Sequence, residues 1–287
     1  MKYAVKDKVF SSKNTLSIHG KVLDISSPKV MGIINVTPDS FYSGSRKQRI
    51  PDILKKASTM LTEGATFLDI GGYSTRPGAS EVPIKEEIQR VLPAIEAIMN
   101  EFPEAIVSID TFRSEVANKA IEAGATMVND ISGGNLDPEM KYLISERNVP
   151  YIIMHMKGTP SNMNMLAKYD NLLTELMDYF QIKVAELHDL GIKDIIIDPG
   201  FGFSKTVEQN YVLLRNLAYF KALELPTLIG ISRKSMIFKT LGIVAEEALN
   251  GTTVLNTIAL QHGAGILRVH DVKEAVQAVT LYNKTYN

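Results

Sequence analysis

Short apolar runs that end in polar or glycine residues recur eight times along the chain, at residues 29–35, 66–72, 105–110, 126–130, 151–156, 194–200, 227–234 and 266–271. The runs are rich in β-branched residues and do not alternate strictly, which is typical of strands covered on both faces. Between them lie longer stretches in which apolar residues recur at helical spacing, such as Ile53, Ala57 and Met60. The pattern therefore predicts strands and helices in alternation.

Regular alternation of this kind favours a parallel sheet, because parallel neighbours must be joined by a crossover element. Eight such units match a (β/α)8 TIM barrel, and a single barrel can occupy most of a chain of 287 residues. We therefore predict an α/β barrel over residues 29–287, with a doubly wound open sheet as the alternative fold. Residues 1–28 form an N-terminal extension in which 15–18 and 21–25 are expected to pair as a β-hairpin.

Glycines stand just before every second predicted strand, at Gly64, Gly124, Gly191 and Gly263. Each suits the residue that follows a helix, where a left-handed backbone costs little without a Cβ atom. The polar stretch 157–168 is expected to form a flexible loop after the fifth strand.

Composition removes several classes of site and partner. The chain holds 31 basic and 32 acidic residues, so no global field favours nucleic acid or an anionic membrane. It contains no cysteine, which excludes disulfides, thiolate zinc sites and a cysteine nucleophile. Neither a signal sequence nor an apolar run of about 20 residues is present, so we expect a soluble, cytoplasmic protein.

Polar residues gather where the predicted strands end, which is where the active site of such a barrel lies. These residues are Asn35, Asp69, Asp110, Asn129, His155, Asp198, Ser232, Arg233, Lys234, Arg268 and His270. One polar residue at a strand end is most often only a solvated edge. A polar residue at the end of every strand indicates a binding site.

Arg268 and His270 are two residues apart, so their side chains point to the same face of the last strand. Together they suit a phosphate group, and the loops after strands seven and eight commonly bind phosphate in this fold. A salt bridge from Arg268 to a nearby carboxylate is an equal alternative. Arg76 lies in a glycine-flanked segment that could close over an anion or form an ordinary surface loop.

Asp110, Asn129 and Asp198 could hold a flat heterocycle through its amino and ring N–H donors, and could stabilise a ligand that becomes cationic. Asn129 rather than the adjacent Asp130 is expected to face the barrel mouth, since neighbouring strand residues point to opposite faces. The same carboxylates could instead form ion pairs with Lys234 and Arg233, or act as a general acid and base.

Lys234 could donate to a ring carbonyl or nitrogen, pair with Asp198, or form a Schiff base. His155 is expected to pack inside the barrel rather than bind a metal, because no second histidine or carboxylate stands at ligand spacing in its segment.

Several motifs resemble those of one family, the dihydropteroate synthases. The similar segments are 31–41 (MGIINVTPDSF), 69–72 (DIGG), 74–78 (STRPG), 108–112 (SIDTF), 129–130 (ND), 154–155 (MH), 198–203 (DPGFGF), 232–235 (SRKS) and 268–270 (RVH). The similarity runs from about residue 15 to the end of the chain. Tyr73 departs from the residues that the family most often has at that place.

The resemblance implies a TIM barrel that joins 7,8-dihydropterin-6-ylmethyl diphosphate to 4-aminobenzoate, releasing pyrophosphate and 7,8-dihydropteroate in folate synthesis. It also implies Mg2+ as cofactor, sulfonamides as inhibitors and a homodimer formed near the C-terminus. The expected order of events is departure of the diphosphate, then attack by the amine.

The resemblance assigns each matching position a role. The implied pterin-binding residues are Asp110, Asn129, Met154, Asp198, Phe203 and Lys234. The implied diphosphate-binding residues are Asn35, which also carries Mg2+, with Arg76, Arg268 and His270. The implied aminobenzoate pocket contains Phe41, Thr75, Pro77 and Ser235. The residues implied to act directly in catalysis are Asp110, Lys234, Arg268 and His270.

Three other functions remain open on the sequence. A pterin-binding methyltransferase would use similar acid and amide positions but needs no diphosphate clamp. A non-catalytic pterin-binding paralogue would lack turnover, and a Schiff-base lyase would act through Lys234.

Overall fold

The computed structural model describes residues 13–18, 20–36, 46–73 and 81–286, with the backbone alone for 46–49. The strands are β1 (Thr15–Ile18), β2 (Lys21–Asp24), β3 (Lys29–Asn35), β4 (Phe67–Gly71), β5 (Ile106–Asp110), β6 (Met127–Asp130), β7 (Tyr151–Met154), β8 (Ile195–Asp198), β9 (Leu228–Ile229) and β10 (Ile266–Val269).

The helices follow the strands in turn. They are α1 (Arg46–Thr62), α2 (Ile84–Glu101), α3 (Ser114–Glu122), α4 (Met140–Arg147), η2 (Met163–Leu166), α5 (Leu172–Asp189), α6 (Val207–Arg215), η3 (Leu217–Leu223), α7 (Ser235–Leu241), η4 (Ala245–Glu247), α8 (Leu249–Gln261) and α9 (Val272–Tyr286). None of these described helices has both the length and the apolar character needed to cross a membrane.

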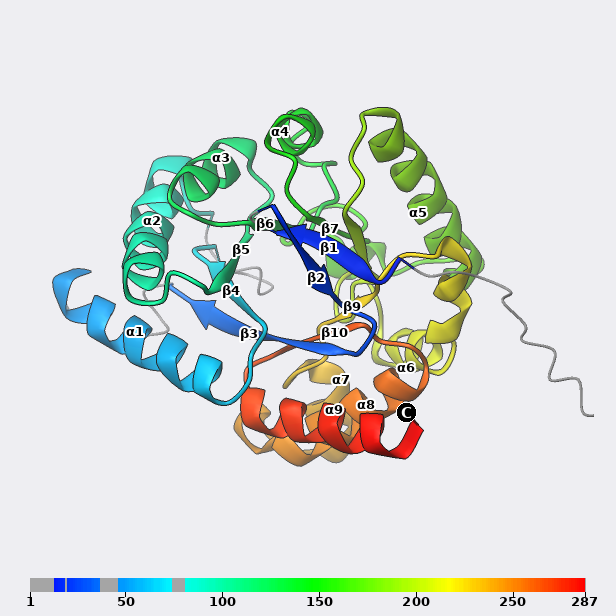
Figure 1. Ribbon diagram of the computed structural model, residues 1–287. Coiled ribbons are helices and arrows are strands. Elements are labelled where there is room, and N and C mark those ends of the chain that lie inside the picture. The colour runs from blue at the N-terminus through cyan, green and yellow to red at the C-terminus, as the bar shows by residue number, and fades with distance from the viewer. Residues whose placement is uncertain (1–12, 19, 37–45, 74–80, 287) are drawn as a thin grey trace, which may run out of the picture.

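The large sheet closes on itself. Its strand order is β8-β7-β6-β5-β4-β3-β10-β9, and all neighbouring strands are parallel. A parallel bridge between Ile197 and Thr227 joins β8 to the residue before β9. The helices surround this ring of strands (Figure 1). The predicted TIM barrel is therefore confirmed, and the open doubly wound sheet is wrong.

The seventh barrel strand is shorter than predicted. The apolar run 227–234 yields only Leu228–Ile229 as β9. Beyond it the chain turns, with the Lys234 N–H donating to the Ile231 carbonyl at 3.0 Å and Arg233 in the left-handed region at φ 54°. Apolar character alone could not reveal this turn, because buried turns and buried strands share it.

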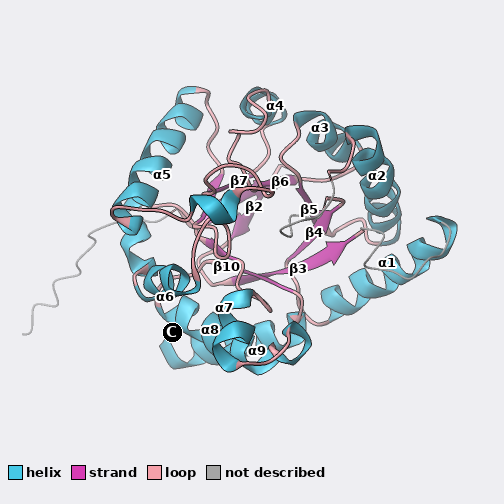
Figure 2. Cartoon of the chain, turned by 180° about the vertical axis from the view of Figure 1, so that it is seen from behind, coloured by secondary structure: helices cyan, strands magenta, loops and turns pink. Residues whose placement is uncertain are grey.

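The predicted N-terminal hairpin is present and covers one end of the barrel (Figure 1). Leu16, Ile18 and Ile25 are buried against inward-facing strand residues such as Phe67 and Met127. This apolar layer fills the barrel at the amino-terminal ends of its strands. The polar strand ends are thus directed to the opposite mouth of the barrel. That mouth faces the viewer in Figure 2.

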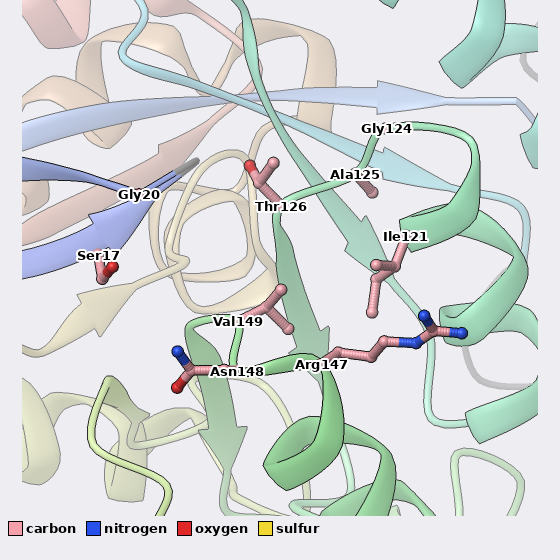
Figure 3. A pocket seen from close by; sticks show the side chains of 9 residues that line it. All are labelled: Ser17, Gly20, Ile121, Gly124, Ala125, Thr126, Arg147, Asn148 and Val149. Carbon is pink, nitrogen blue, oxygen red and sulfur yellow. The ribbon is translucent and has the colours of Figure 1, made fainter.

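A cavity of about 380 Å³ lies beside the hairpin. Ser17 and Gly20 of the hairpin line it, together with Thr126 and Val149 from the segments just before β6 and β7 (Figure 3). It therefore opens at the amino-terminal end of the strands, away from the polar residues at their carboxyl ends.

The predicted helix-end glycines adopt left-handed backbone conformations. The φ angles are 100° at Gly64, 112° at Gly124, 79° at Gly191 and 99° at Gly263. The predicted loop 157–168 contains the short helix η2, and Met163 within it is buried against Met154.

Gly200, in the turn after β8, should tolerate a side chain less well than Gly191. Both have φ near 75–80°, but a Cβ at Gly200 would lie 2.2 Å from the His155 carbonyl oxygen, whereas Gly191 has open space. Gly200→Ala should lower the free energy of unfolding by about 3 kcal/mol or more, and Gly191→Ala by about 1–2 kcal/mol. Urea unfolding of both variants measures this, and equal losses would contradict it.

Candidate active site

A buried polar cluster occupies the carboxyl-terminal mouth of the barrel. Asp69 of β4 is fully buried, and its Oδ2 accepts hydrogen bonds from Asn129 Nδ2 at 3.0 Å and Arg268 Nε at 2.6 Å. A second guanidinium N–H of Arg268 donates to Asp110 Oδ2 at 2.6 Å. Side chains from four strands, β4, β5, β6 and β10, thus meet above the apolar layer.

The cluster holds more acid than base. One guanidinium contacts two carboxylates, and burial raises the pKa of Asp110 to about 7, with Asp69 acting in the same direction and Arg268 opposing it. Burial alone would lower the pKa of Arg268, but the same carboxylates outweigh it and raise that pKa above its usual range. Asp69 Oδ1 is buried without a hydrogen-bond partner in the described structure. The mouth is therefore suited to a ligand that offers N–H donors or positive charge.

Asp198 and Lys234 form the second part of the site. Asp198 Oδ1 accepts the Gly200 N–H at 2.8 Å, and burial raises the pKa of this carboxyl group. Burial also lowers the pKa of Lys234 to about 8, although the nearby Asp198 opposes the change. Lys234 donates to the Phe201 carbonyl, and its Nζ lies 4.7 Å from the centre of the Phe203 ring.

An apolar wall stands beside these charges. Met154, at the end of β7, is buried together with Ile131 and Met163, and Phe203 packs against the same cluster. A flat ring between this wall and the carboxylates would contact apolar carbon and sulfur on one side and polar edges on the other.

His270 and Asn35 lie at the same mouth. Burial and the positive charge of Arg268 lower the pKa of His270 to about 4, so the imidazole is neutral at pH 7 and can donate one N–H. A Cβ atom placed on Gly71 would lie 3.6 Å from Asn35 Oδ1 and 3.5 Å from Asp110 Oδ2. The amide of Asn35 and the carboxyl of Asp110 therefore face the same glycine.

Most of the predicted site residues come together in this region. Ser235 follows Lys234 directly as the first residue of α7. Asp130 points away from the mouth, where it accepts a hydrogen bond from the Tyr151 hydroxyl, while Asn129 contacts Asp69. This is the predicted orientation of the two neighbours. Phe41, Thr75, Arg76 and Pro77 lie outside the described residues.

The proposed pairing of Arg233 with the site carboxylates is wrong. Arg233 makes a two-point ion pair with Asp271, each hydrogen bond being 2.9 Å long. The left-handed turn at Arg233 directs its side chain toward the carbonyls of Ala245 and Glu246, away from the barrel axis. It thereby holds the turn that presents Lys234.

Sequence reasoning missed two buried polar residues of the mouth. Asp69 was placed at a strand end but given no role, although it contacts both Asn129 and Arg268. No pattern in the sequence singles out Lys205, whose Nζ lies 3.1 Å from Nδ1 of the buried His155. The signal for Asp69 was its place among apolar residues in the run 66–72, because an isolated buried acid needs a partner.

A magnesium ion bound with a phosphate group fits the residues near Asn35. Within the described part of the chain, no three histidine or acidic side chains converge to form a metal cage. Mg2+ prefers oxygen ligands and often keeps few from the protein, completing its shell with water and substrate phosphates. The amide oxygen of Asn35 offers such a ligand.

Comparison with known proteins agrees with this geometry. The family model described as pterin binding enzyme matches residues 31–270. Dihydropteroate synthase from Escherichia coli strain K12 is 43% identical over 272 residues, which cover 94% of this chain and 96% of that protein. The chain belongs to the dihydropteroate synthase family of pterin binding enzymes.

Solved structures of dihydropteroate synthases share the fold. The Yersinia pestis enzyme in a sulfonamide drug complex is 41% identical and superposes with a TM-score of 0.88, covering 94% of this chain and 98% of that one. The Thermus thermophilus enzyme in complex with 4-aminobenzoate is 34% identical, with a TM-score of 0.85 and coverage of 95% and 100%.

The raised pKa of Asp110 predicts how stability depends on pH. Between about pH 4 and pH 7 the folded protein keeps a proton on Asp110 that the unfolded chain has released, so this contribution to stability falls as pH rises. The unfolding free energy of the native protein minus that of Asp110→Asn should decline across this window, by at most about 1.4 kcal/mol per pH unit, and level off above it.

Urea unfolding of both proteins at several pH values measures the difference. If the difference instead increased with pH, the charge of Arg268, rather than burial, would dominate the pKa of Asp110.

Proposed function

We propose that the protein catalyses the dihydropteroate synthase reaction, joining 7,8-dihydropterin-6-ylmethyl diphosphate to 4-aminobenzoate with release of pyrophosphate. The observation that carries the proposal is the cluster of two acids, Asp69 and Asp110, and the amide of Asn129, joined by hydrogen bonds to the basic side chain of Arg268 in one barrel mouth. Such a site can bind an N–H-rich ring and a departing anion side by side. Relatives named dihydropteroate synthase match nearly the full chain. Their similarity favours this reaction over methyl transfer, Schiff-base lysis or binding without turnover.

Asp110, Asn129, Asp198 and Lys234 would hold the polar edges of the pterin. The amino and ring N–H groups of the pterin match carboxylate and amide oxygens, and the ammonium of Lys234 suits a ring carbonyl or nitrogen. Met154 and Phe203 would contact the ring faces. Binding of N–H donors favours the ionised form of Asp110, so it should lower the raised pKa of that group.

Arg268 and His270 would bind the diphosphate. The two hydrogen bonds that Arg268 donates to carboxylates among the described residues use one N–H each, which leaves three of its five N–H groups for phosphate oxygens. His270 is neutral at pH 7, and a bound dianion would favour its protonated form. Asn35 would carry Mg2+ together with the diphosphate, and Arg76 would complete the anion site. When bound, Mg2+ would withdraw negative charge from the leaving group.

Departure of the diphosphate is proposed to precede attack. Aminobenzoate is a weak amine, whereas a neutralised diphosphate leaves readily. The carboxylates of Asp110 and Asp198 would stabilise the cation that remains on the pterin. The amine then needs no strong base.

The aminobenzoate would lie at the outer rim. Ser235 follows Lys234 in the chain, and Phe41, Thr75 and Pro77 are proposed to complete the pocket. Sulfonamides mimic aminobenzoate and are expected to compete for this pocket. The complex of the Yersinia pestis relative with a sulfonamide drug supports that expectation.

A homodimer near the C-terminus is also proposed. Exposed apolar side chains on two packed helices support it, with Val254 on α8 at 49% exposure and Leu281 on α9 at 69%. Leaving these side chains in water is unfavourable, and a second copy could cover them. A single species of monomer mass in sedimentation velocity would contradict the dimer.

A pyrophosphate-release assay with both substrates tests the proposed function. Release should require 4-aminobenzoate for sustained turnover and should fall strongly when Mg2+ is removed with a chelator, because the diphosphate then keeps its full charge. Dihydropteroate should form in equal amount, as measured by chromatography. Pterin binding by calorimetry without any turnover would contradict the proposal.

Asp110→Asn is the informative variant in the same assay. If the carboxylate stabilises a cation that forms only during reaction, kcat should drop by roughly 100-fold while pterin affinity changes far less. Equal losses in kcat and in affinity would instead assign Asp110 to binding alone.

A further inference from the structure

Lys205 is a buried lysine beneath the candidate site. It follows the turn after β8 and is only 7% exposed, although lysines are seldom buried without a charged partner. Among the described residues, no carboxylate lies within ion-pair distance of its ammonium group. Such a costly placement calls for a specific task.

The side-chain amine of Lys205 contacts three acceptors, one for each N–H of its protonated form; burial lowers the pKa of Lys205 to about 7, with Asp198 opposing the change. Lys205 Nζ lies 3.1 Å from His155 Nδ1, from the Gly200 carbonyl and from the Phe203 carbonyl. Burial lowers the pKa of His155 to about 2, so the imidazole is neutral and its Nδ1 can accept. Lys205 therefore ties the end of β7 to two carbonyls of the turn after β8.

That turn carries the groups assigned to the pterin. Asp198 begins it and accepts the Gly200 N–H, the Phe201 carbonyl accepts from Lys234, and the Phe203 ring lies 4.7 Å from Lys234 Nζ. The turn therefore contains Asp198 and contacts Lys234, the two charged side chains of the pterin half of the site.

The backbone of the turn is not a regular element. Its residues Gly200, Gly202 and Ser204 have φ angles of 75°, 78° and 45°. The turn makes one backbone hydrogen bond of its own, from the Phe203 N–H to the Gly200 carbonyl at 3.1 Å, and its other carbonyls depend on donors from outside the turn. Lys205 supplies donors to two carbonyls of the turn from below, while Lys234 donates to a third from the site.

We propose that Lys205 is a positioning residue for the pterin half of the site: its ammonium group fixes the turn 198–204 against His155, so that Asp198 and Lys234 keep the separation that fits the ring. The inference rests on the proposed function. Lys205 acts through the turn and touches no substrate.

Removing the ammonium group should weaken pterin recognition selectively. In Lys205→Met the Phe203 carbonyl loses its donor, the Gly200 carbonyl keeps only the Phe203 N–H at 3.1 Å, and the turn relaxes around Asp198. The KM for the pterin diphosphate should rise by roughly tenfold, because binding must then restore the turn, and an unsatisfied buried acceptor changes an equilibrium by roughly 5- to 100-fold. The KM for 4-aminobenzoate, which binds at the outer rim, should stay within about twofold of the native value.

Lys157→Met is the matched control. Lys157 is the neighbouring lysine, but its Nζ contacts Glu175 Oε2 and the Lys168 carbonyl, each at 2.7 Å, rather than the turn. Its backbone N–H bond to Ser204 Oγ does not depend on the side chain. Both KM values should therefore remain native in this variant. Circular dichroism and thermal unfolding establish that each variant is folded.

Lys205→Gln, which keeps N–H donors without the charge, is measured in parallel and should raise the KM for the pterin diphosphate less than Lys205→Met does. If Lys205→Met does not fold, the KM of Lys205→Gln for the pterin diphosphate tests the proposal in its place. A folded Lys205 variant with native KM for the pterin diphosphate, or with equal rises in both KM values, would overturn the proposal. Absence of turnover in the native protein would instead refute the proposed function.

Discussion

The mouth of the barrel depends on one half-buried guanidinium. Arg268 contacts Asp69 and Asp110 at 2.6 Å each, and two buried carboxylates without it would face each other in an apolar surrounding. Asp69 would then keep the Asn129 amide as its donor while Asp110 would lie beside a like charge, which is unfavourable for two desolvated acids. Arg268 belongs to the last barrel strand, β10, and the two acids to β4 and β5. The same ion pairs therefore connect an early part of the chain to its last strand.

This electrostatic arrangement connects the two halves of the proposed chemistry. The excess of acid over base favours a ring that offers N–H groups or acquires positive charge, and the remaining N–H groups of Arg268 can meet an anion. Formation of a cation and departure of an anion would then both take place next to Arg268. The apolar hairpin layer below keeps this polarity at a single end of the barrel.

Sequence pattern predicted the elements and their order because period and length leave strong signals. It predicted the barrel, the hairpin and the orientation of Asn129 relative to Asp130. It failed at β9, since the turn at Arg233 depends on a distant ion pair with Asp271 that no local pattern encodes. It also gave no role to Asp69 and did not find Lys205, because both owe their environment to contacts between segments far apart in the chain.

The most direct test of the central ion pair is a double-mutant cycle on unfolding free energy with Arg268→Met, Asp110→Asn and the combined variant. If the guanidinium chiefly compensates the buried acid, the combined variant should be more stable than the sum of the single losses predicts, by about 2 kcal/mol. Additive losses would show that Arg268 and Asp110 stabilise the fold independently and would contradict the account.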